Sequence, residues 1–219
     1  LASSFMLSTK AGKVVHMEPV VDAGEYRFKV RVGKPRDEKV AKDGTKYSRG
    51  NFRCLMSGSP IQPAYIKAEA QAGRMGAQLM AIVAEGSRGR VYLDAQSEQQ
   101  DFAKKCQPEW RPEVEFFQQA LGFRVGNYGM KQWSDLFTDR QLVALTTFST
   151  LARNAREIVK ADAALGGCDE NGLTLGEGGT GADAYADAVS TYLTFAVSKA
   201  ADRNTSLCVW ESKMDRMRG

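Results

Sequence analysis

Apolar and polar residues alternate in two runs near the start of the chain, which is the pattern of half-buried β-strands. In residues 26–32, aromatic and branched apolar side chains alternate with cations, so one face is apolar and the other is basic. Residues 14–20 alternate in a similar way, and Ala23-Gly24 between the two runs predicts a turn. The start of the chain is therefore predicted to be an antiparallel β-hairpin.

The pattern changes several times before the middle of the chain. Residues 34–51 are polar and rich in lysine, and they are predicted to be a mobile loop. The alanines of residues 63–72 predict a short helix. The continuous apolar run 79–84, the turn 85–89 and the run 90–93 predict a second hairpin.

The second half of the chain has the spacing of long helices. Thr138 followed by Gln141 fits a capping box, which predicts a helix start at this point. Apolar residues then recur on one side of the predicted helix, and we expect them to be buried: Leu142, Leu145, Phe148, Leu151, Ala155, Ile158 and Val159. A second amphipathic helix is predicted over residues 182–201 and is expected to pack against the first.

Two further segments of the second half are predicted from composition. Residues 95–120 are predicted to be helical, with breaks at Pro108 and Pro112. The glycine-rich residues 166–181 match neither a dinucleotide-binding loop nor a Walker loop, so a flexible linker is predicted there.

These elements predict an α+β protein. N-terminal antiparallel hairpins with a short helix are expected to precede a helical part with two long amphipathic helices. We place the boundary so that residues 1–95 form a β-rich basic region and residues 96–219 form a mainly helical region.

Composition limits the function only loosely. The 219 residues carry 30 Lys and Arg against 26 Asp and Glu, giving a net charge of +4, which permits nucleic-acid binding without requiring it. No run reaches the ~18 apolar residues of a membrane span, so no membrane partner is expected. The start has no basic segment ahead of an apolar one, so we expect a cytoplasmic protein with free thiols at its four cysteines.

The basic strand, the lysine-rich loop, the second hairpin and the loop at residues 122–133 combine cations, amides and aromatic rings, which suits contact with phosphates and bases. Solvated surfaces and a structural turn at the loop are the alternatives that these residues leave open. The residues predicted to bind nucleic acid are Arg27, Lys29, Arg31, Lys46, Arg49, Asn51, Arg74, Arg88, Arg90, Arg124, Asn127, Tyr128, Lys131 and Trp133.

Three long runs, in the same order, resemble runs of the bacterial adenine-specific DNA methylases that contain a zinc ribbon. The runs are Gly73–Gly86, Leu121–Val159, and Ala184–Val189 continuing to Asp202–Asn204 and Trp210. The resemblance implies DNA as a partner and S-adenosylmethionine as the cofactor of the parent protein. It also implies that residues 1–95 are a target-recognition or degenerate zinc-ribbon-like part.

The motifs that carry methyl transfer in that family are missing from this sequence. Neither the Asp-Pro-Phe-x-Gly-Ser-Gly turn for S-adenosylmethionine nor Asp-Pro-Pro-Tyr for the flipped adenine occurs. We therefore expect an internal fragment that contributes DNA recognition, has no catalytic or cofactor-binding residue of its own, and contacts the remaining domains of its parent. The alternative is a structural or interaction module of a larger bacterial protein.

The resemblance also bears on metal binding. At Cys54 the family has a zinc knuckle, Cys-x-x-Cys-Gly, but Ser57 replaces the second cysteine in this sequence. Serine is a poor zinc ligand, and a structural zinc takes four sulfur or imidazole ligands. His16 is the only histidine and is expected to be a packed or surface residue. No metal ligand is therefore predicted.

Overall fold

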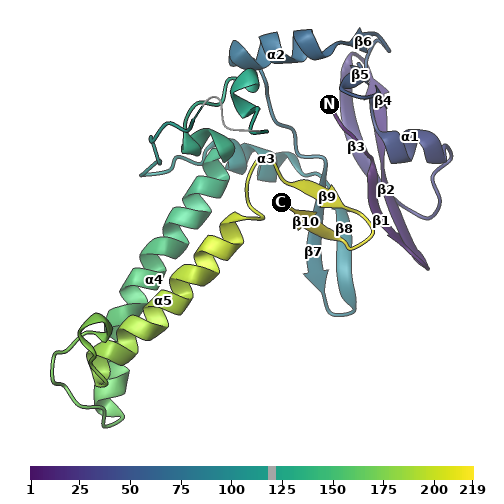
Figure 1. The fold of residues 1–219 in the computed structure, drawn as a ribbon. Helices are drawn as coiled ribbons and strands as arrows, with labels where there is room; N and C mark the ends of the chain where they lie inside the picture. The colour runs from purple at the N-terminus through teal and green to yellow at the C-terminus, as the bar shows by residue number, and fades with distance from the viewer. Residues whose placement is uncertain (118–121) are drawn as a thin grey trace. The chain divides into compact units, whose positions relative to one another are not determined.

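A computed structural model describes residues 1–117 and 122–219 of the chain. Antiparallel strands occupy its N-terminal part and two long helices its C-terminal part, which confirms the predicted α+β class (Figure 1). The chain forms two compact units. The first contains residues 1–105, 113–135 and 209–218, and the second contains residues 106–112, 136–208 and 219.

The first unit is built on a three-stranded antiparallel sheet, with β2 in the centre. Its strands are β1 (Met6–Lys10), β2 (Lys13–Asp22) and β3 (Glu25–Val32), so the predicted first hairpin is confirmed. Alternation places one set of side chains in a buried apolar core: Phe5, Leu7, Val15, Met17 and Phe28. Burial of such apolar area supplies most of the stability of a sheet of this kind.

Smaller elements complete the first unit. The predicted helix is α2 (Pro63–Gln71), and the predicted second hairpin is β7 (Ala81–Gly86) with β8 (Gly89–Asp94). Val83 of β7 and Tyr92 of β8 pack against the apolar core. The last hairpin joins β9 (Val209–Glu211) to β10 (Arg216–Arg218) and lies beside β1, where the Thr9 N–H donates to the Ser212 carbonyl at 3.0 Å.

The prediction of a mobile loop over residues 34–51 is wrong. This segment contains α1 (Glu38–Asp43) and β4 (Lys46–Ser48), and it continues into β5 (Asn51–Arg53) and β6 (Pro60–Ile61). The Asp37 carboxylate accepts a hydrogen bond from the Val40 N–H at 2.9 Å and so caps α1. Ala41 is buried, and a six-residue helix with a single buried side chain leaves little periodicity to detect.

The helical prediction for residues 95–120 holds only at its start. Helix α3 covers Ser97–Lys104, and residues 105–117 form no further helix, with a β-bridge between Glu115 and Gln132. Prolines at positions 108 and 112 disfavour a helical conformation of the residues before them. Residues 118–120 of the prediction lie outside the described residues, as does Leu121 of the family resemblance.

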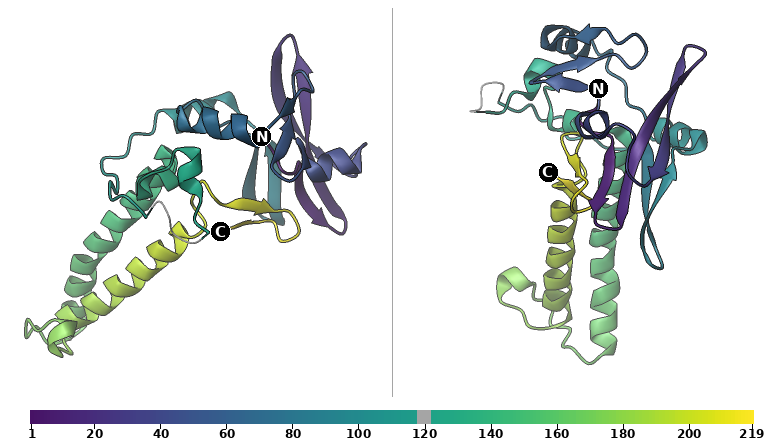
Figure 2. Two further views of the ribbon diagram at one scale, coloured as in Figure 1. Left: turned by 45° about the horizontal axis from the view of Figure 1, so that its top comes forward. Right: turned by 90° about the vertical axis from the view of Figure 1, so that its right-hand side faces the viewer.

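The second unit is an antiparallel pair of helices, α4 (Asp139–Leu165) and α5 (Ala182–Ala201), which lie side by side in both views of Figure 2. The capping box between Thr138 and Gln141 is present, as predicted. The pairing of the two helices is confirmed as well. Arg156 and Lys160 of α4 form ion pairs with Asp183 of α5.

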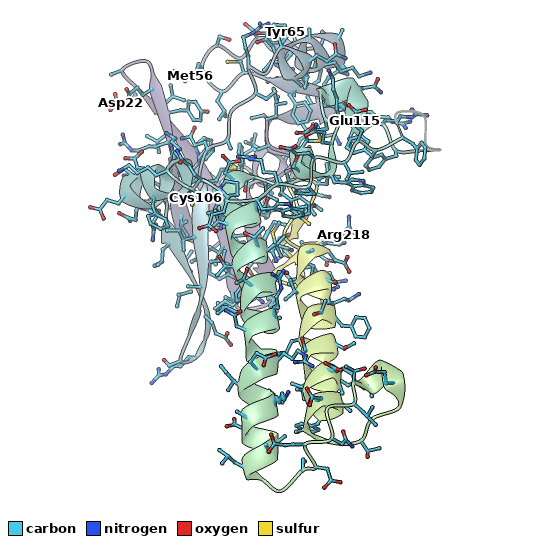
Figure 3. All side chains as sticks on the ribbon, turned by 90° about the vertical axis from the view of Figure 1, so that its left-hand side faces the viewer. Asp22, Met56, Tyr65, Cys106, Glu115 and Arg218 are labelled. Atoms are coloured by element: carbon cyan, nitrogen blue, oxygen red, sulfur yellow. The ribbon has the colours of Figure 1, made fainter. Side chains whose placement is uncertain are left out.

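The prediction that the apolar stripe of α4 is buried is wrong for three of its large residues. Leu142 is buried, but Phe148, Leu151 and Ile158 are exposed, Ile158 by 63%. Apart from Leu142 and Asp183, the buried residues of the two helices are alanines: Ala152, Ala163, Ala182, Ala184 and Ala186. Side chains extend from both helices away from the pair as well as toward it (Figure 3).

The glycine-rich residues 166–181 fold into an ordered loop, so the predicted flexible linker is wrong. A short 3₁₀ helix, η3 (Leu175–Glu177), lies within it, and the Leu175 N–H donates to the Asp187 carboxylate at 3.0 Å. A Cβ on Gly179 would collide with the Leu173 carbonyl oxygen. This glycine is therefore required by the close approach of two backbone segments.

Candidate nucleic-acid interface

The three predicted cations of β3 lie on the face opposite Phe28. Arg31 donates to Glu18 across the sheet at 2.8 Å, and this hydrogen bond is the main reason that the pKa of Glu18 is lowered. Arg27 and Lys29 have no carboxylate within 4.0 Å in the part of the chain that the structure describes. They are therefore the members of this group with charge available to an external anion.

Lys46, Arg49 and Asn51 lie on the hairpin formed by β4 and β5. Asn51 donates from Nδ2 to the Ser48 hydroxyl at 2.8 Å, so this amide closes the turn. Lys46 and Arg49 are exposed and make no ion pair with any described residue. The hairpin thus presents two cations without acidic partners and one amide that stabilises the loop carrying them.

Arg74 and the segment around Asn127 are brought together by α2. The 3₁₀ helix η1 (Val125–Tyr128) packs against α2, and Gln71 donates to the Asn127 carbonyl at 3.2 Å. Arg74 itself makes a bidentate ion pair with Glu69, at 2.8 and 2.7 Å, which raises the pKa of Arg74. The side chains of Asn127 and Tyr128 are exposed beside this helix end.

Trp133 belongs to an aromatic cluster. Its ring centroid lies 5.8 Å from Phe116 and 6.4 Å from Phe123, with the Phe116 ring edge-on. One side of Trp133 remains accessible, because the residue is 47% exposed. Arg124 and Lys131 are exposed on the same loop and have no acidic partner among the described residues. The loop therefore offers an aromatic face next to unpaired cations.

Arg88 and Arg90 lie on the hairpin of β7 and β8, where the structure adds residues that the sequence did not identify. The Lys13 ammonium donates to the Arg90 carbonyl oxygen and lies 5.5 Å from the centre of the Tyr92 ring. The Arg90 guanidinium lies 5.9 Å from the centre of the Trp210 ring. These segments are far apart in the sequence, so no local pattern connects them.

The predicted residues do not form one network. Arg74 and Asn127 share the end of α2, whereas the cations of β3, of the β4–β5 hairpin and of the β7–β8 hairpin form separate groups. Within residues 1–117 and 122–219, no hydrogen bond, ion pair or ring contact links the β3 cations to the loop at 124–133.

Cys54 lines a cavity of about 570 Å³ in the first unit, together with Phe28, Leu55 and Met80. A hydrogen bond from the Ser57 hydroxyl, helped by the backbone N–H groups of Ser57 and Met56, lowers the pKa of the Cys54 thiol. Among the described residues, no three or more His, Cys, Asp or Glu side chains converge as a metal site. The four cysteines form no disulfide within the part of the chain that the structure describes.

A second cavity, of about 540 Å³, lies in the helical unit beside the first half of α4. Trp110 and Phe137 line it together with Leu142 and Leu145, and among the described residues of this lining Arg153 is the only charged one. The cavity is mainly apolar.

A buried polar cluster fixes the C-terminal hairpin to β1. Asp215 is almost fully buried and forms an ion pair with Lys10 at 2.9 Å. The hydroxyls of Ser8 and Tyr92 lie beside the Asp215 carboxylate. Its second oxygen, Oδ1, has no hydrogen bond of full geometry among the described residues. Burial alone would raise the pKa of Asp215, but these neighbours more than offset that effect and the pKa is lowered.

Comparisons of the chain with protein-family models, with curated proteins and with solved structures found no match. Across residues 1–117 and 122–219, no helix combines the length and the hydropathy that crossing a membrane demands.

Proposed function

We propose that this chain is the DNA-recognition part of an adenine-specific DNA methyltransferase of bacterial type. Binding of S-adenosylmethionine and methyl transfer then belong to other parts of the parent protein, because the motifs for both are missing from this sequence. The proposal rests on the family resemblance of the sequence and on the scarcity of acidic partners for its predicted cations.

The observation that carries the proposal is the scarcity of carboxylate partners for the predicted cations. Among the described residues, only Arg31 and Arg74 of these cations form ion pairs. A cation without a partner can neutralise a phosphate without breaking an existing ion pair, and each phosphate neutralised in this way releases counterions from DNA. The exposed rings of Tyr128 and Trp133 add faces on which an unstacked base can lie.

Binding to a labelled DNA duplex, followed by fluorescence anisotropy over a range of salt concentrations, tests this proposal. Affinity should fall steeply with salt. Replacing Arg27 and Lys29 by Gln should reduce the slope of log K against log salt by roughly 0.9 for each phosphate that is no longer neutralised. Arg111→Gln is the matched control, because Arg111 is already paired with Asp139 at 2.9 Å. Binding that does not respond to salt would refute the proposal.

A second candidate function is favoured by the outward side chains of the helical unit. Tyr192 is 75% exposed and Phe195 is 63% exposed on α5, and Phe148 and Leu151 are exposed on α4. Large exposed apolar surface is typical of interaction sites. The chain would then be an interaction module whose helices dock on another protein or domain.

Light scattering after size-exclusion chromatography separates the two candidates when it is combined with the DNA titration. An interaction module should self-associate at high concentration, and Tyr192→Ser with Phe195→Ser should return it to a monomer without changing DNA binding. A monomeric chain at all concentrations that binds DNA with the expected salt slope would leave only the first candidate.

A further inference from the structure

The region where β8, β9 and the start of β2 meet contains two cations that are held by aromatic rings. Lys13 lies over Tyr92, with 5.5 Å from its nitrogen to the ring centre, and also donates to the Arg90 carbonyl. The Arg90 guanidinium lies over Trp210, at 5.9 Å. Both contacts are within the range in which a cation is attracted to an aromatic face.

The two rings are themselves firmly placed. Trp210 donates from Nε1 to the Leu7 carbonyl at 2.7 Å, which ties β9 to β1. Tyr92 is partly buried and packs against the apolar core of the first unit. The cations above these rings are consequently positioned by the folded sheet, and little side-chain freedom remains to be lost when they bind.

Carboxylates do not neutralise this pair of cations. Glu85 is the register partner of Arg90 on the neighbouring strand, yet no ion pair joins them. Asp215, the buried acid nearby, already forms an ion pair with Lys10 at 2.9 Å. Among the described residues, neither Lys13 nor Arg90 has an acidic group within 4.0 Å. The guanidinium donors of Arg90 therefore remain available.

We propose that Lys13 and Arg90 form a preorganised phosphate-binding pair that anchors the DNA backbone. This inference rests on the proposed DNA-recognition function and gives it a specific contact point. A planar guanidinium matches two oxygens of a phosphodiester, while an ammonium neutralises a neighbouring phosphate as a point charge. Arg88, exposed at the adjacent turn, extends the positive surface.

The test compares Lys13→Gln, Arg90→Gln and Arg90→Lys with the unmodified chain in DNA titrations at several salt concentrations. Each Gln variant should reduce the salt slope by about 0.9 and weaken binding roughly tenfold near 0.1 M salt. Arg90→Lys keeps the charge but loses the planar fork, so it should weaken binding and preserve the slope. Lys199→Gln is the control, because Lys199 is an exposed cation already paired with Asp202.

The outcomes distinguish this inference from the proposed function. If the unmodified chain binds DNA with a steep salt slope and both Gln variants keep that slope, the anchor is refuted and the proposed function survives. If the unmodified chain does not bind DNA, the anchor and the proposed function are both refuted. Phosphatidylserine vesicles form a further arm, and binding to them without binding to DNA would also refute the pair as a DNA anchor. Circular dichroism confirms that each variant is folded, and Arg90→Lys tests the pair even if Arg90→Gln is unstable.

Discussion

Gly129 directly follows the loop that carries Asn127 and Tyr128, and its backbone tolerates no side chain. Its φ angle is +80°, in the left-handed region, and a Cβ would lie 2.8 Å from the Ala70 carbonyl oxygen. Gly129→Ala should therefore separate η1 from α2. Gly73, at the end of α2, has a φ of +69° but no atom within 4 Å of its Cβ position, so Gly73→Ala is the matched control.

The expected magnitudes follow from these two environments. An alanine in the left-handed region costs about 1–2 kcal/mol. The loss of unfolded-state entropy that accompanies Gly→Ala returns roughly 0.4–1 kcal/mol. Gly73→Ala should accordingly cost about 1 kcal/mol or less. Gly129→Ala adds the clash with α2 and the loss of the hydrogen bond between Gln71 and the Asn127 carbonyl, roughly 0.5–1.5 kcal/mol. Its total should reach about 2 kcal/mol.

Urea unfolding followed by tryptophan fluorescence measures the difference, because Trp133 lies on the same loop. The midpoint should fall clearly further for Gly129→Ala than for Gly73→Ala, with similar dependence on urea concentration. Equal midpoints would show that the backbone contact between η1 and α2 does not constrain this loop, and the reasoning about its placement would be wrong.

Further predictions concern the core, a carboxylate and a thiol. Phe5 is 1% exposed, so Phe5→Ala should cost about 3–5 kcal/mol in urea unfolding, whereas Phe195→Ala should cost little, and similar losses would contradict the assigned core. Because the pKa of Asp215 is lowered in the folded state, the ionised carboxylate stabilises the fold above about pH 3.9. This stabilisation is lost as the pH falls through the folded pKa. Asp215→Asn should therefore destabilise the protein near neutral pH by an amount that shrinks in acid, and a difference independent of pH would argue against this charge. Ser57→Ala should raise the pKa of Cys54 and slow its alkylation by iodoacetamide near neutral pH, which mass spectrometry measures. An unchanged alkylation rate would show that the Ser57 hydroxyl does not stabilise the thiolate.

Local signals predicted most of the regular structure. The alternation in residues 26–32 is sufficient for a strand, because side chains of a strand point to opposite faces in turn. The capping box at Thr138 predicted the start of α4 at the correct residue, since the bonds involved span only three positions. Short elements such as α1 escaped detection because a helix of six residues contains too few positions to show a period.

The sequence by itself determined the hairpins of β2 with β3 and of β7 with β8, the two long helices and the candidate cations, because each depends on neighbours within a few residues. Only the tertiary structure decided which side of α4 is buried. Periodicity defines a face but not what lies against it, and here alanines such as Ala152 and Ala163 are buried while Phe148 and Ile158 are exposed. The same holds for Lys13, Arg90 and Trp210, whose grouping depends on the packing of hairpins distant in the sequence. Long-range packing of this kind follows from the folded core and leaves no pattern in any local segment.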